Sequence, residues 1–473
     1  MNHGYTVAQI RAAETAAMAV LGPDVLMQRA AAGLAAAVLR RLRDGGAYGA
    51  RVLLVVGSGN NGGDALYAGA RLAGRGVAVT AWRTATAVHE AGWRAFLAAG
   101  GRERDATGAR ALLGSQRLVV DGVAGIGSRP GLAPQIAAFA AACASLRVPV
   151  VAVDLPSGIA PEPPFSGEPH FAADVTVTFG GYKLCQLLEP GRSACGELEL
   201  VDLGLALPKP TVSQWTDAEL AEAWPVPDAT SDKYSRGVVG LDTGSVDYPG
   251  AAVLTAAGAV GAGAGMVRYL GPLPVATRVV DRFPNVVIGQ GRVQSLVVGS
   301  GWGQRKDHGV VARGVAARVP LVVDADALRY LPARGGHPEV VLTPHAGELA
   351  RMLDLTREQV EGDPLAAVGS AVAATGCTVL LKGATQFVST PGGNRVWLAV
   401  PGPGWTAQAG SGDVLAGICG ALLAAGLPPA TAALAAASVQ ATAALRHPGP
   451  LPPQALAERL VKVVREMVQN ALR

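Results

Sequence analysis

Residues 52–64 read VLLVVGSGNNGGD, and this stretch decides the fold of the first half of the chain. Five consecutive apolar residues, Val52–Val56, indicate a strand buried on both faces, as in a parallel sheet covered by helices. A glycine-rich turn and then a helical stretch over Ala65–Ala73 follow it directly. The succession of strand, tight turn and helix predicts an α/β domain.

The same alternation of short β-branched runs and Ala-rich stretches continues along the chain. Further strands are predicted at 77–81, 118–120, 148–153 and 175–178, and at 296–298, 320–323 and 379–381. We expect a first, Rossmann-like three-layer domain over residues 1–210 and a second α/β domain over 229–473. Between them, the proline-rich residues 211–228 are expected to be a linker without a strand.

Composition narrows the class of protein. The 473 residues carry a net charge of only +4 and no Lys/Arg block with interleaved aromatics, so nucleic acid is not an expected partner. Five cysteines without C-x-x-C spacing predict free thiols in a reducing compartment, and the N-terminal residues have no secretory pattern, so we expect a cytoplasmic protein. The apolar stretches near 251–266 and 428 read as core helices, not membrane spans.

Oxygen-bearing side chains follow three of the predicted strands. Asn60, Asn61 and Asp64 lie on the first turn, Asp121 opens DGVAGIG, and Asp154 opens DLPSG. In a parallel sheet these loops share one edge, where such folds bind ligands. Amide and carboxylate oxygens suit hard cations or sugar hydroxyls. The strand at 77–81 ends without an acid, which argues against redox NAD binding, and tight structural turns with Asp caps are the alternative interpretation.

The motifs GSGNNGGD, DGVAGIG, AVDLPSG and ADVTVTFGGYK, in this order over residues 1–205, resemble the NAD(P)H-hydrate epimerase family. The resemblance implies that Asp154 contacts the substrate and serves in acid/base catalysis. It implies potassium ligation by Asn61, Asp121 and Ser157. It implies substrate contacts from Asn60, Asn61, Gly62, Gly63, Asp64, Gly125, Ile126, Gly127, Ser128, Arg129, Pro130 and Gly131. Lys183 is either a second proton-transfer group or a solvated loop lysine.

A second set of motifs lies near the C-terminus. The small residues Ala409–Gly412 precede Asp413 and a helical stretch over Val414–Ala425. Backbone N–H groups at a helix start neutralise phosphoryl charge, and an Asp there accepts a proton from an attacking hydroxyl. An Asp N-cap after a glycine turn is the alternative. Asp324 and Asp326 end another strand and either help organise Mg²⁺ or make structural hydrogen bonds.

YPGAA at 248–252, TPHAGE, LKGATQ and AGSGDVLAG resemble the ribokinase-like superfamily and, within it, the NAD(P)H-hydrate dehydratase family. The resemblance covers residues 230–470. It implies Mg²⁺ and ADP or ATP as cofactors, and Asp413 as the catalytic base. It implies hydrate contacts from Ala251, Gly303, His345 and Asp413, and nucleotide contacts from Lys382, Gly383, Ala384, Thr385, Gln386 and Gly412. Ser300 stands where the family more often has proline.

Together the two resemblances predict a bifunctional repair enzyme for hydrated NADH and NADPH. The first domain would interconvert the R and S hydrates, and the second would dehydrate the S form at the expense of ADP or ATP, with release of phosphate. The fused arrangement favours ADP. Two alternatives are a small-molecule kinase for a vitamin precursor alcohol and a non-catalytic binding module in the first half. The sequence leaves open whether the Ala/Gly-rich chain forms a homo-oligomer, which hydrate it prefers, and whether substrate passes between the sites.

Overall fold

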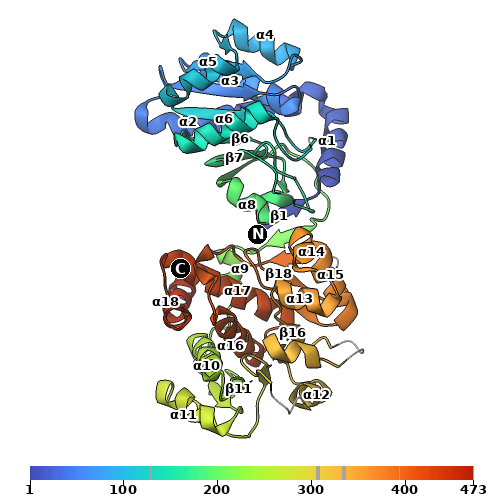
Figure 1. The fold of residues 1–473 in the computed structure, drawn as a ribbon, viewed down its shortest axis with the longest axis vertical. Helices are drawn as coiled ribbons and strands as arrows, with labels where there is room; N and C mark the ends of the chain where they lie inside the picture. The colour runs from blue at the N-terminus through green and yellow to red at the C-terminus, as the bar shows by residue number, and fades with distance from the viewer. Residues whose placement is uncertain (128, 166, 305–308, 333–336, 394, 472–473) are drawn as a thin grey trace. The chain divides into compact units, whose positions relative to one another are not determined.

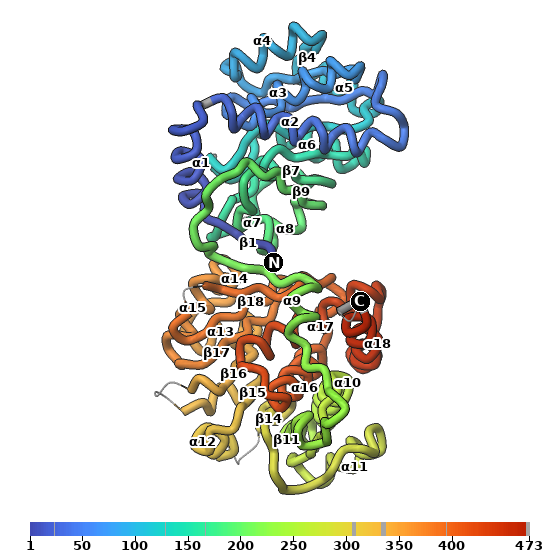
Figure 2. Tube along the Cα trace, turned by 180° about the vertical axis from the view of Figure 1, so that it is seen from behind, coloured from blue at the N-terminus to red at the C-terminus, as the bar shows by residue number. Residues whose placement is uncertain are grey.

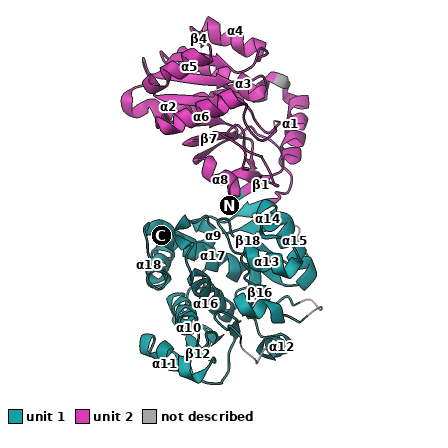
Figure 3. Cartoon of the chain, viewed as in Figure 1, with its two compact units in different colours: residues 1–2, 212–473 teal, residues 3–211 magenta. Residues whose placement is uncertain are grey.

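The computed structural model describes residues 1–473 except 128, 166, 305–308, 333–336, 394 and 472–473. The chain divides into two compact units (Figure 3). The first unit is His3–Thr211, and the second is Val212–Arg473 together with Met1–Asn2. Strands alternate with helices throughout both units, which confirms the predicted α/β class.

The described residues of the first unit form a sheet of seven parallel strands. In spatial order these are β4 (Arg102–Arg104), β3 (Ala78–Arg83), β2 (Arg51–Val56), β5 (Leu118–Gly122), β6 (Val150–Val153), β7 (Val175–Phe179) and β9 (Glu197–Val201). The short strand β1 (Asn2–Tyr5) pairs in parallel with β8 (Tyr182–Lys183). The unit also contains α1 (Val7–Leu21), α4 (Glu90–Ala98), α7 (Leu184–Leu187) and α8 (Gly191–Ala194).

Strand β2 shows why its apolar run is unbroken. Val52, Leu54 and Val56 pack into one core with α2 (Pro23–Leu42) and α3 (Asn60–Ala73). Leu53 and Val55 pack into another core with α5 (Ala106–Leu112) and α6 (Pro134–Ser145) on the opposite face (Figure 1). Alternate side chains of a strand point to opposite faces, so a sheet covered on both faces needs apolar residues at every position.

Helix α3 begins at Asn60, five residues before the predicted start, so the expectation that residues 60–64 form a loop is wrong. Gly59 is the extended N-cap residue. Gly62 passes so close to Gly57 that a Cβ there would lie 2.1 Å from the Gly57 carbonyl oxygen, which allows the helix to start this early. Asn61 and Asp64 therefore lie three residues apart on one helix face.

The sheet of the second unit is mixed. Its strands lie in the order β13 (Val287–Ile288), β12 (Met266–Tyr269), β11 (Val238–Asp242), β14 (Ser295–Val298), β15 (Leu321–Val323), β16 (Val340–Leu342), β17 (Thr378–Leu381), β18 (Phe387–Ser389), β19 (Val396–Leu398) and β10 (Val212–Gln214). Pairing is parallel from β13 to β17 and antiparallel from β17 to β19. Outside the C-terminal helices, the unit contains α11 (Leu273–Arg282), α12 (Gly309–Ala316), α13 (Ala346–Leu353), α14 (Arg357–Gly362) and α15 (Pro364–Thr375).

Residues 211–228 are not the unstructured linker that we expected. Val212–Gln214 form β10, which pairs in parallel with the edge strand β19. Asp217–Ala223 form α9, whose Leu220 is fully buried in the core of the second unit. The prolines that suggested a linker lie before β10 and after α9, so they interrupt neither the short strand nor the helix.

Three apolar helices, α10 (Pro249–Gly261), α16 (Ser411–Ala424) and α17 (Pro429–Arg446), pack together in the core of the second unit with the apolar face of α18 (Pro453–Ala471). The apolar stretches that we interpreted as core helices are therefore confirmed. No helix among the described residues is both apolar enough and long enough to span a bilayer. Helices α10 and α16 approach closely, since a Cβ on Gly417 would lie 2.0 Å from the Thr255 carbonyl oxygen.

We expect Gly417→Ala to destabilise the second unit by about 1–3 kcal/mol, because the added methyl group would overpack the contact between α10 and α16. Urea unfolding followed by tryptophan fluorescence measures the change. The matched control is Gly369→Ala, inside the exposed side of α15, where a Cβ meets nothing within 4 Å. That substitution should be neutral or stabilising by up to about 1 kcal/mol. Equal stability of the two variants would contradict the packing argument.

Candidate active sites

Asp121 and Ser157 are joined at the carboxyl edge of the first sheet. The two carboxylate oxygens of Asp121 accept hydrogen bonds from the Ser157 backbone N–H at 2.7 Å and from the Ser157 hydroxyl at 2.6 Å. Asp121 is fully buried, and burial raises the pKa of its carboxyl group to about 6, although the Ser157 hydrogen bonds lower it. Its hydrogen-bond donors within the described residues are neutral groups, so a cation here would stabilise the ionised form.

Asn61 connects the loops that follow β5 and β6. Its Nδ2 donates to the Val153 carbonyl oxygen at 2.6 Å and to the Ala124 carbonyl oxygen at 3.1 Å. The Ala124 backbone N–H in turn donates to the Ser157 hydroxyl at 2.9 Å. The three residues predicted to ligate potassium therefore form one hydrogen-bonded group in which the ligating atoms would all be oxygens.

Asp154 forms a buried ion pair with Lys183. The Lys183 ammonium, in a side chain only 1% exposed, donates to Asp154 Oδ1, to the Thr178 hydroxyl at 3.0 Å and to the Phe179 carbonyl oxygen at 2.9 Å. The interpretation of Lys183 as a solvated loop lysine is wrong, because the chain returns through Gly180 and Gly181 and buries it. Thr178 was not predicted, although it stands within the motif ADVTVTFGGYK.

The backbone of Asp154 has a φ of +67°, in the left-handed region that a residue with a side chain rarely adopts. The Asp154 N–H donates to the Val177 carbonyl oxygen at 2.8 Å, and its carbonyl oxygen accepts from Gln186 Nε2 at 2.6 Å. These contacts hold the strained conformation and aim the carboxylate at Lys183. Strain maintained by surrounding contacts is typical of functional residues.

The predicted substrate contacts are distributed unevenly around this pair. Asp64 is buried, and burial together with the charges of Asp154 and Glu14 raises the pKa of its carboxyl group well above the usual range. Asn60 is exposed at the start of α3, while Gly62 and Gly63 are buried inside its first turn. In the second loop Gly125 and Ile126 are half-buried, Gly131 donates its backbone N–H to the Gly158 carbonyl oxygen, and Gly127, Arg129 and Pro130 are exposed. Ser128 lies outside the described residues.

In the second unit, Asp413 stands in the first turn of α16, which begins at Ser411 after Gly410 in a left-handed conformation. The Ser411 hydroxyl is buried and has no hydrogen-bond partner among the described residues. Unpaired donors at the positive end of a helix dipole fit a phosphate group. Burial and the charge of Asp324 raise the pKa of the Asp413 carboxyl group to about 7, while the charge of Lys382 lowers it.

Asp324 is held by three protein donors. Its carboxylate accepts from Lys382 Nζ at 2.7 Å, from the Thr343 hydroxyl at 2.8 Å and from the Ser300 hydroxyl at 2.8 Å. Of the two roles weighed for Asp324, this arrangement supports structural hydrogen bonding, since both carboxylate oxygens are already engaged. Asp326 likewise accepts a hydrogen bond from the Gly303 backbone N–H at 2.8 Å.

Lys382 links Asp324 to the start of α16. A Cβ on Gly412 would lie 3.2 Å from Lys382 Nζ, which places the ammonium group beside the residue preceding Asp413. Burial lowers the pKa of Lys382, but the charges of Asp324, Glu348 and Asp413 outweigh burial and raise it, so the side chain is a cation. The ammonium group thus lies where it can neutralise both Asp413 and an incoming phosphoryl group.

The loops around this charge cluster contain the other predicted contacts. Ala251 lies in the first turn of α10, next to Gly301. Gly301 and Gly303 both lie against Tyr248, the residue that precedes the helix. His345 is the N-cap residue of α13, and its Nδ1 accepts hydrogen bonds from the Gly347 and Glu348 backbone N–H groups. Its backbone forms an isolated parallel β-bridge with Lys382. The turn Gly383–Gln386 connects β17 to β18, and the Gln386 side-chain oxygen is buried without a partner among the described residues.

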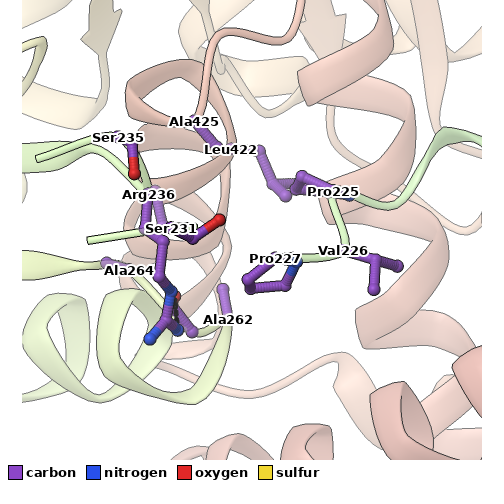
Figure 4. Close-up of a pocket in the computed structure, with 12 residues that line it drawn as sticks. Pro225, Val226, Pro227, Ser231, Ser235, Arg236, Ala262, Ala264, Leu422 and Ala425 are labelled. Carbon is purple, nitrogen blue, oxygen red and sulfur yellow. Dashed lines mark hydrogen bonds between the residues drawn. The ribbon is translucent and has the colours of Figure 1, made fainter. Parts of the chain in front are cut away.

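A cavity of about 200 Å³ lies at the other end of α16 and is not part of this site. Figure 4 shows its lining from the segment Pro225–Arg236 and from the C-terminal ends of α10 and α16, at Ala262 and Leu422. Leu422 is nine residues after Asp413, which corresponds to about 13 Å along a helix axis. The cavity therefore lies away from Asp413, at the opposite end of the helix.

Comparisons with known proteins agree with this division into two sites. The sequence model described as NAD(P)H-hydrate dehydratase matches residues 239–464, and that described as YjeF-related protein N-terminus matches residues 23–185. The bifunctional NAD(P)H-hydrate repair enzyme of Mycobacterium leprae is 44% identical, over 98% of this chain and 99% of its own length. That of Mycobacterium tuberculosis is 43% identical, over 92% and 91%.

Solved structures resemble the second unit. An ADP/ATP-dependent NAD(P)H-hydrate dehydratase from Bacillus subtilis, co-crystallised with ATP and Mg²⁺, is 26% identical with a TM-score of 0.50 and covers 54% of this chain and 99% of its own. A ribokinase-like superfamily protein from Enterococcus faecalis, 21% identical with a TM-score of 0.50, covers 56% of this chain and 99% of its own and shows the same fold.

The folds and the family matches define a two-domain α/β enzyme, and each unit has its own buried cluster of charged side chains. One cluster pairs a carboxylate with a lysine, and the other adds the start of a helix suited to phosphate. The chain belongs to the family of bifunctional NAD(P)H-hydrate repair enzymes. The predicted family and ribokinase-like fold are confirmed, while the roles of individual residues stay predictions.

We expect Lys183→Met to destabilise the first unit by about 3–5 kcal/mol, because it leaves the Asp154 carboxylate buried without its cation. Hydrogen exchange of peptides from β6 and β7 reports opening of this unit. The control is Arg40→Met, which breaks the ion pair with Glu199 at a side chain that is 53% exposed and should cost less than about 1 kcal/mol. Similar costs for the two variants would show that burial does not govern the Lys183 pair.

Proposed function

We propose that the two units repair hydrated NADH and NADPH in succession, the first as an epimerase and the second as an ADP- or ATP-dependent dehydratase. The observation that carries this proposal is that each unit has its own buried acid–base centre, Asp154 with Lys183 and Asp413 with Lys382. Neither rival explains both centres. A small-molecule kinase would explain only the centre of the second unit. A non-catalytic binding module in the first unit would not need the strained, ion-paired carboxylate of Asp154.

In the first unit, Asp154 would exchange a proton with the hydroxyl of the hydrate. Its ion pair with Lys183 fixes the position of the carboxylate that would accept this proton. Water adds to an enamine at the carbon next to nitrogen, so the hydrate has a hydroxyl at that carbon, whose configuration distinguishes R from S. Removal of the hydroxyl proton is the first step by which such a centre can lose and regain its configuration.

Asn61, Asp121 and Ser157 fit a potassium ion by the chemistry of their donor atoms. A carboxylate, an amide oxygen and a hydroxyl are hard oxygen ligands, and one buried carboxylate matches one positive charge. No cluster of three His, Cys, Asp or Glu side chains suited to a metal occurs among the described residues. A bound potassium ion would hold the loops after β5 and β6 against α3.

In the second unit, the nucleotide phosphates would lie at the start of α16. Asp413 would take the proton of the hydrate hydroxyl, whose oxygen attacks the terminal phosphoryl group. The N–H groups of Gly410–Gly412 and the Lys382 ammonium would neutralise the developing charge. The ring nitrogen then expels phosphate, and loss of a proton from the neighbouring carbon restores the double bond. Phosphorylation converts hydroxide, a poor leaving group, into phosphate, a good one.

Mg²⁺ bound to the nucleotide would supply further charge neutralisation. Asp324 already accepts three hydrogen bonds from protein donors, which occupy most of its acceptor sites. We therefore assign the ion to the nucleotide phosphates. ADP as the donor, a cytoplasmic location and small molecules as the partners stay predictions, and the oligomeric state stays open.

Recovery of NADH absorbance from mixed R and S hydrates tests the whole proposal, with Mg²⁺, potassium, and ADP or ATP supplied in turn. Nucleotide-dependent recovery of both hydrates, faster than spontaneous epimerisation, is expected. Asp413→Ala should abolish dehydration while R and S hydrates still interconvert, because the two centres lie in different units. No recovery with either nucleotide would refute the dehydratase, and a stable phosphorylated product would favour the kinase.

The dehydratase rate should rise with pH through an apparent pKa near 7, because Asp413 must lose its proton to act as a base. Ser300→Ala removes the hydroxyl that donates to Asp324, so the Asp324 charge, which raises the pKa of Asp413, is less compensated and the rise should move to higher pH. The matched control is Ser295→Ala, a buried serine whose hydroxyl donates to the Gly420 carbonyl oxygen at 2.6 Å. The dependence of kcat/KM on pH, with pure S hydrate as substrate, is measured for both variants. A profile unchanged by Ser300→Ala would contradict the assigned contact.

A further inference from the structure

Helix α1 borders the epimerase centre, although none of its residues was a predicted contact. A Cβ on Gly181 would lie 3.2 Å from Ile10 Cδ1, and Gly181 is two residues before Lys183. A Cβ on Gly127 would lie 2.9 Å from Arg11 Nη2, and Gly127 belongs to the loop after β5. Helix α1 therefore contacts the two loops that flank the ion pair, and Figures 1 and 2 both show it along one side of the unit.

Glu14 lies on the same face of α1. It follows Ile10 by four residues and Arg11 by three, and residues so spaced are neighbours on a helix surface. Ile10 is fully buried and Glu14 is half-buried, so this face is turned towards the protein. The Glu14 carboxyl group is close enough to Lys183, Asp154 and Arg11 for their charges to act on it.

The carboxyl groups around Lys183 outnumber its positive charge, which favours a proton on one of them. Asp64, Asp154 and Glu14 supply three carboxyl groups around the single ammonium of Lys183, with Arg11 at the outer side of α1. Lys183 is committed to Asp154 by a direct hydrogen bond. Burial and the Asp154 charge raise the pKa of Glu14, more than the Lys183 charge lowers it. The cluster thus combines a carboxylate paired with Lys183 and a second carboxyl group, that of Glu14, whose pKa is raised.

We propose that Glu14 is a catalytic residue of the epimerase centre and donates a proton to the ring nitrogen while Asp154 accepts the proton of the hydroxyl. This inference rests on the proposed epimerase activity. Pairs of carboxyl groups with different environments are how one site supplies both an acid and a base.

The step balances without another reagent. Asp154 takes the hydroxyl proton, the bond between the hydroxyl-bearing carbon and the ring nitrogen breaks, and the nitrogen takes the Glu14 proton. The ring is then open with an aldehyde at its end, which turns about the adjacent carbon–carbon bond. Closure returns the nitrogen proton to Glu14, forms the carbon–nitrogen bond on the other face of the carbonyl, and returns the Asp154 proton to the oxygen. No atom or electron is gained or lost.

The test uses Glu14→Gln in the full chain, with R hydrate supplied alone. Nucleotide is left out so that the second unit cannot consume S hydrate, and the rate at which S hydrate appears is measured by chromatography. We expect kcat for epimerisation to fall about 10²–10⁴-fold, as for loss of a general acid. Glu14→Asp, which keeps a carboxyl group, should recover part of the loss. The matched control is Glu90→Gln at the exposed start of α4, which should epimerise as the wild type does.

The possible failures are distinguishable. Dehydration of pure S hydrate by the same Glu14→Gln sample shows that the second unit is intact, and unchanged hydrogen exchange of β6 and β7 shows that the first is folded. Wild-type kcat in such a folded variant, or an increase in KM with kcat unchanged, would overturn the catalytic role of Glu14. A wild-type chain that does not accelerate epimerisation would overturn the proposed function itself.

Discussion

Burial of parallel strands on both faces is the constraint on which the rest of the structure depends. Strand β2 is apolar and buried from Val52 to Val56, so polar chemistry gathers at the strand ends and in the loops that follow them. Parallel strands bring those loops to one edge. In the first unit this edge collects Asn61, Asp121 and Asp154, and in the second it collects Asp324 and Lys382. Both units therefore place charged side chains where a hydrophobic layer lies directly beneath them.

In each unit one lysine compensates the negative charge of a buried carboxylate. A buried carboxylate is costly unless a cation and hydrogen-bond donors compensate it. Lys183 compensates Asp154, with Thr178 as a further donor. Lys382 compensates Asp324, which leaves Asp413 only partly compensated and its pKa near neutrality. The difference suits the proposed chemistry, because the first centre exchanges protons reversibly whereas the second must take a proton from a hydroxyl that attacks phosphorus.

Much of the fold and of the site could be predicted, because local sequence carries these signals. Apolar runs located the predicted strands to within two residues, and the glycine motifs located the loops at the sheet edge. The start of α3 and the segment 211–228 could not be predicted. Asn60–Asp64 resembles a loop by composition, yet close passage of Gly62 over Gly57 lets it begin a helix. Val212–Gln214 becomes a strand only because the edge of β19 is available for pairing.

The sequence by itself determined the α/β class, the existence of two domains, the family, and the residue types at each sheet edge. These depend on periodicity and short motifs, which neighbouring residues define. Only the tertiary structure decided which charges meet: that Lys183 is buried against Asp154, that Ser300 and Thr343 hold Asp324, and that Glu14 on α1 faces the first centre. Such partners are separated by up to about 170 residues, so no local pattern encodes them. Their pairing follows from how the elements pack, and the packing also sets which carboxyl groups keep a proton.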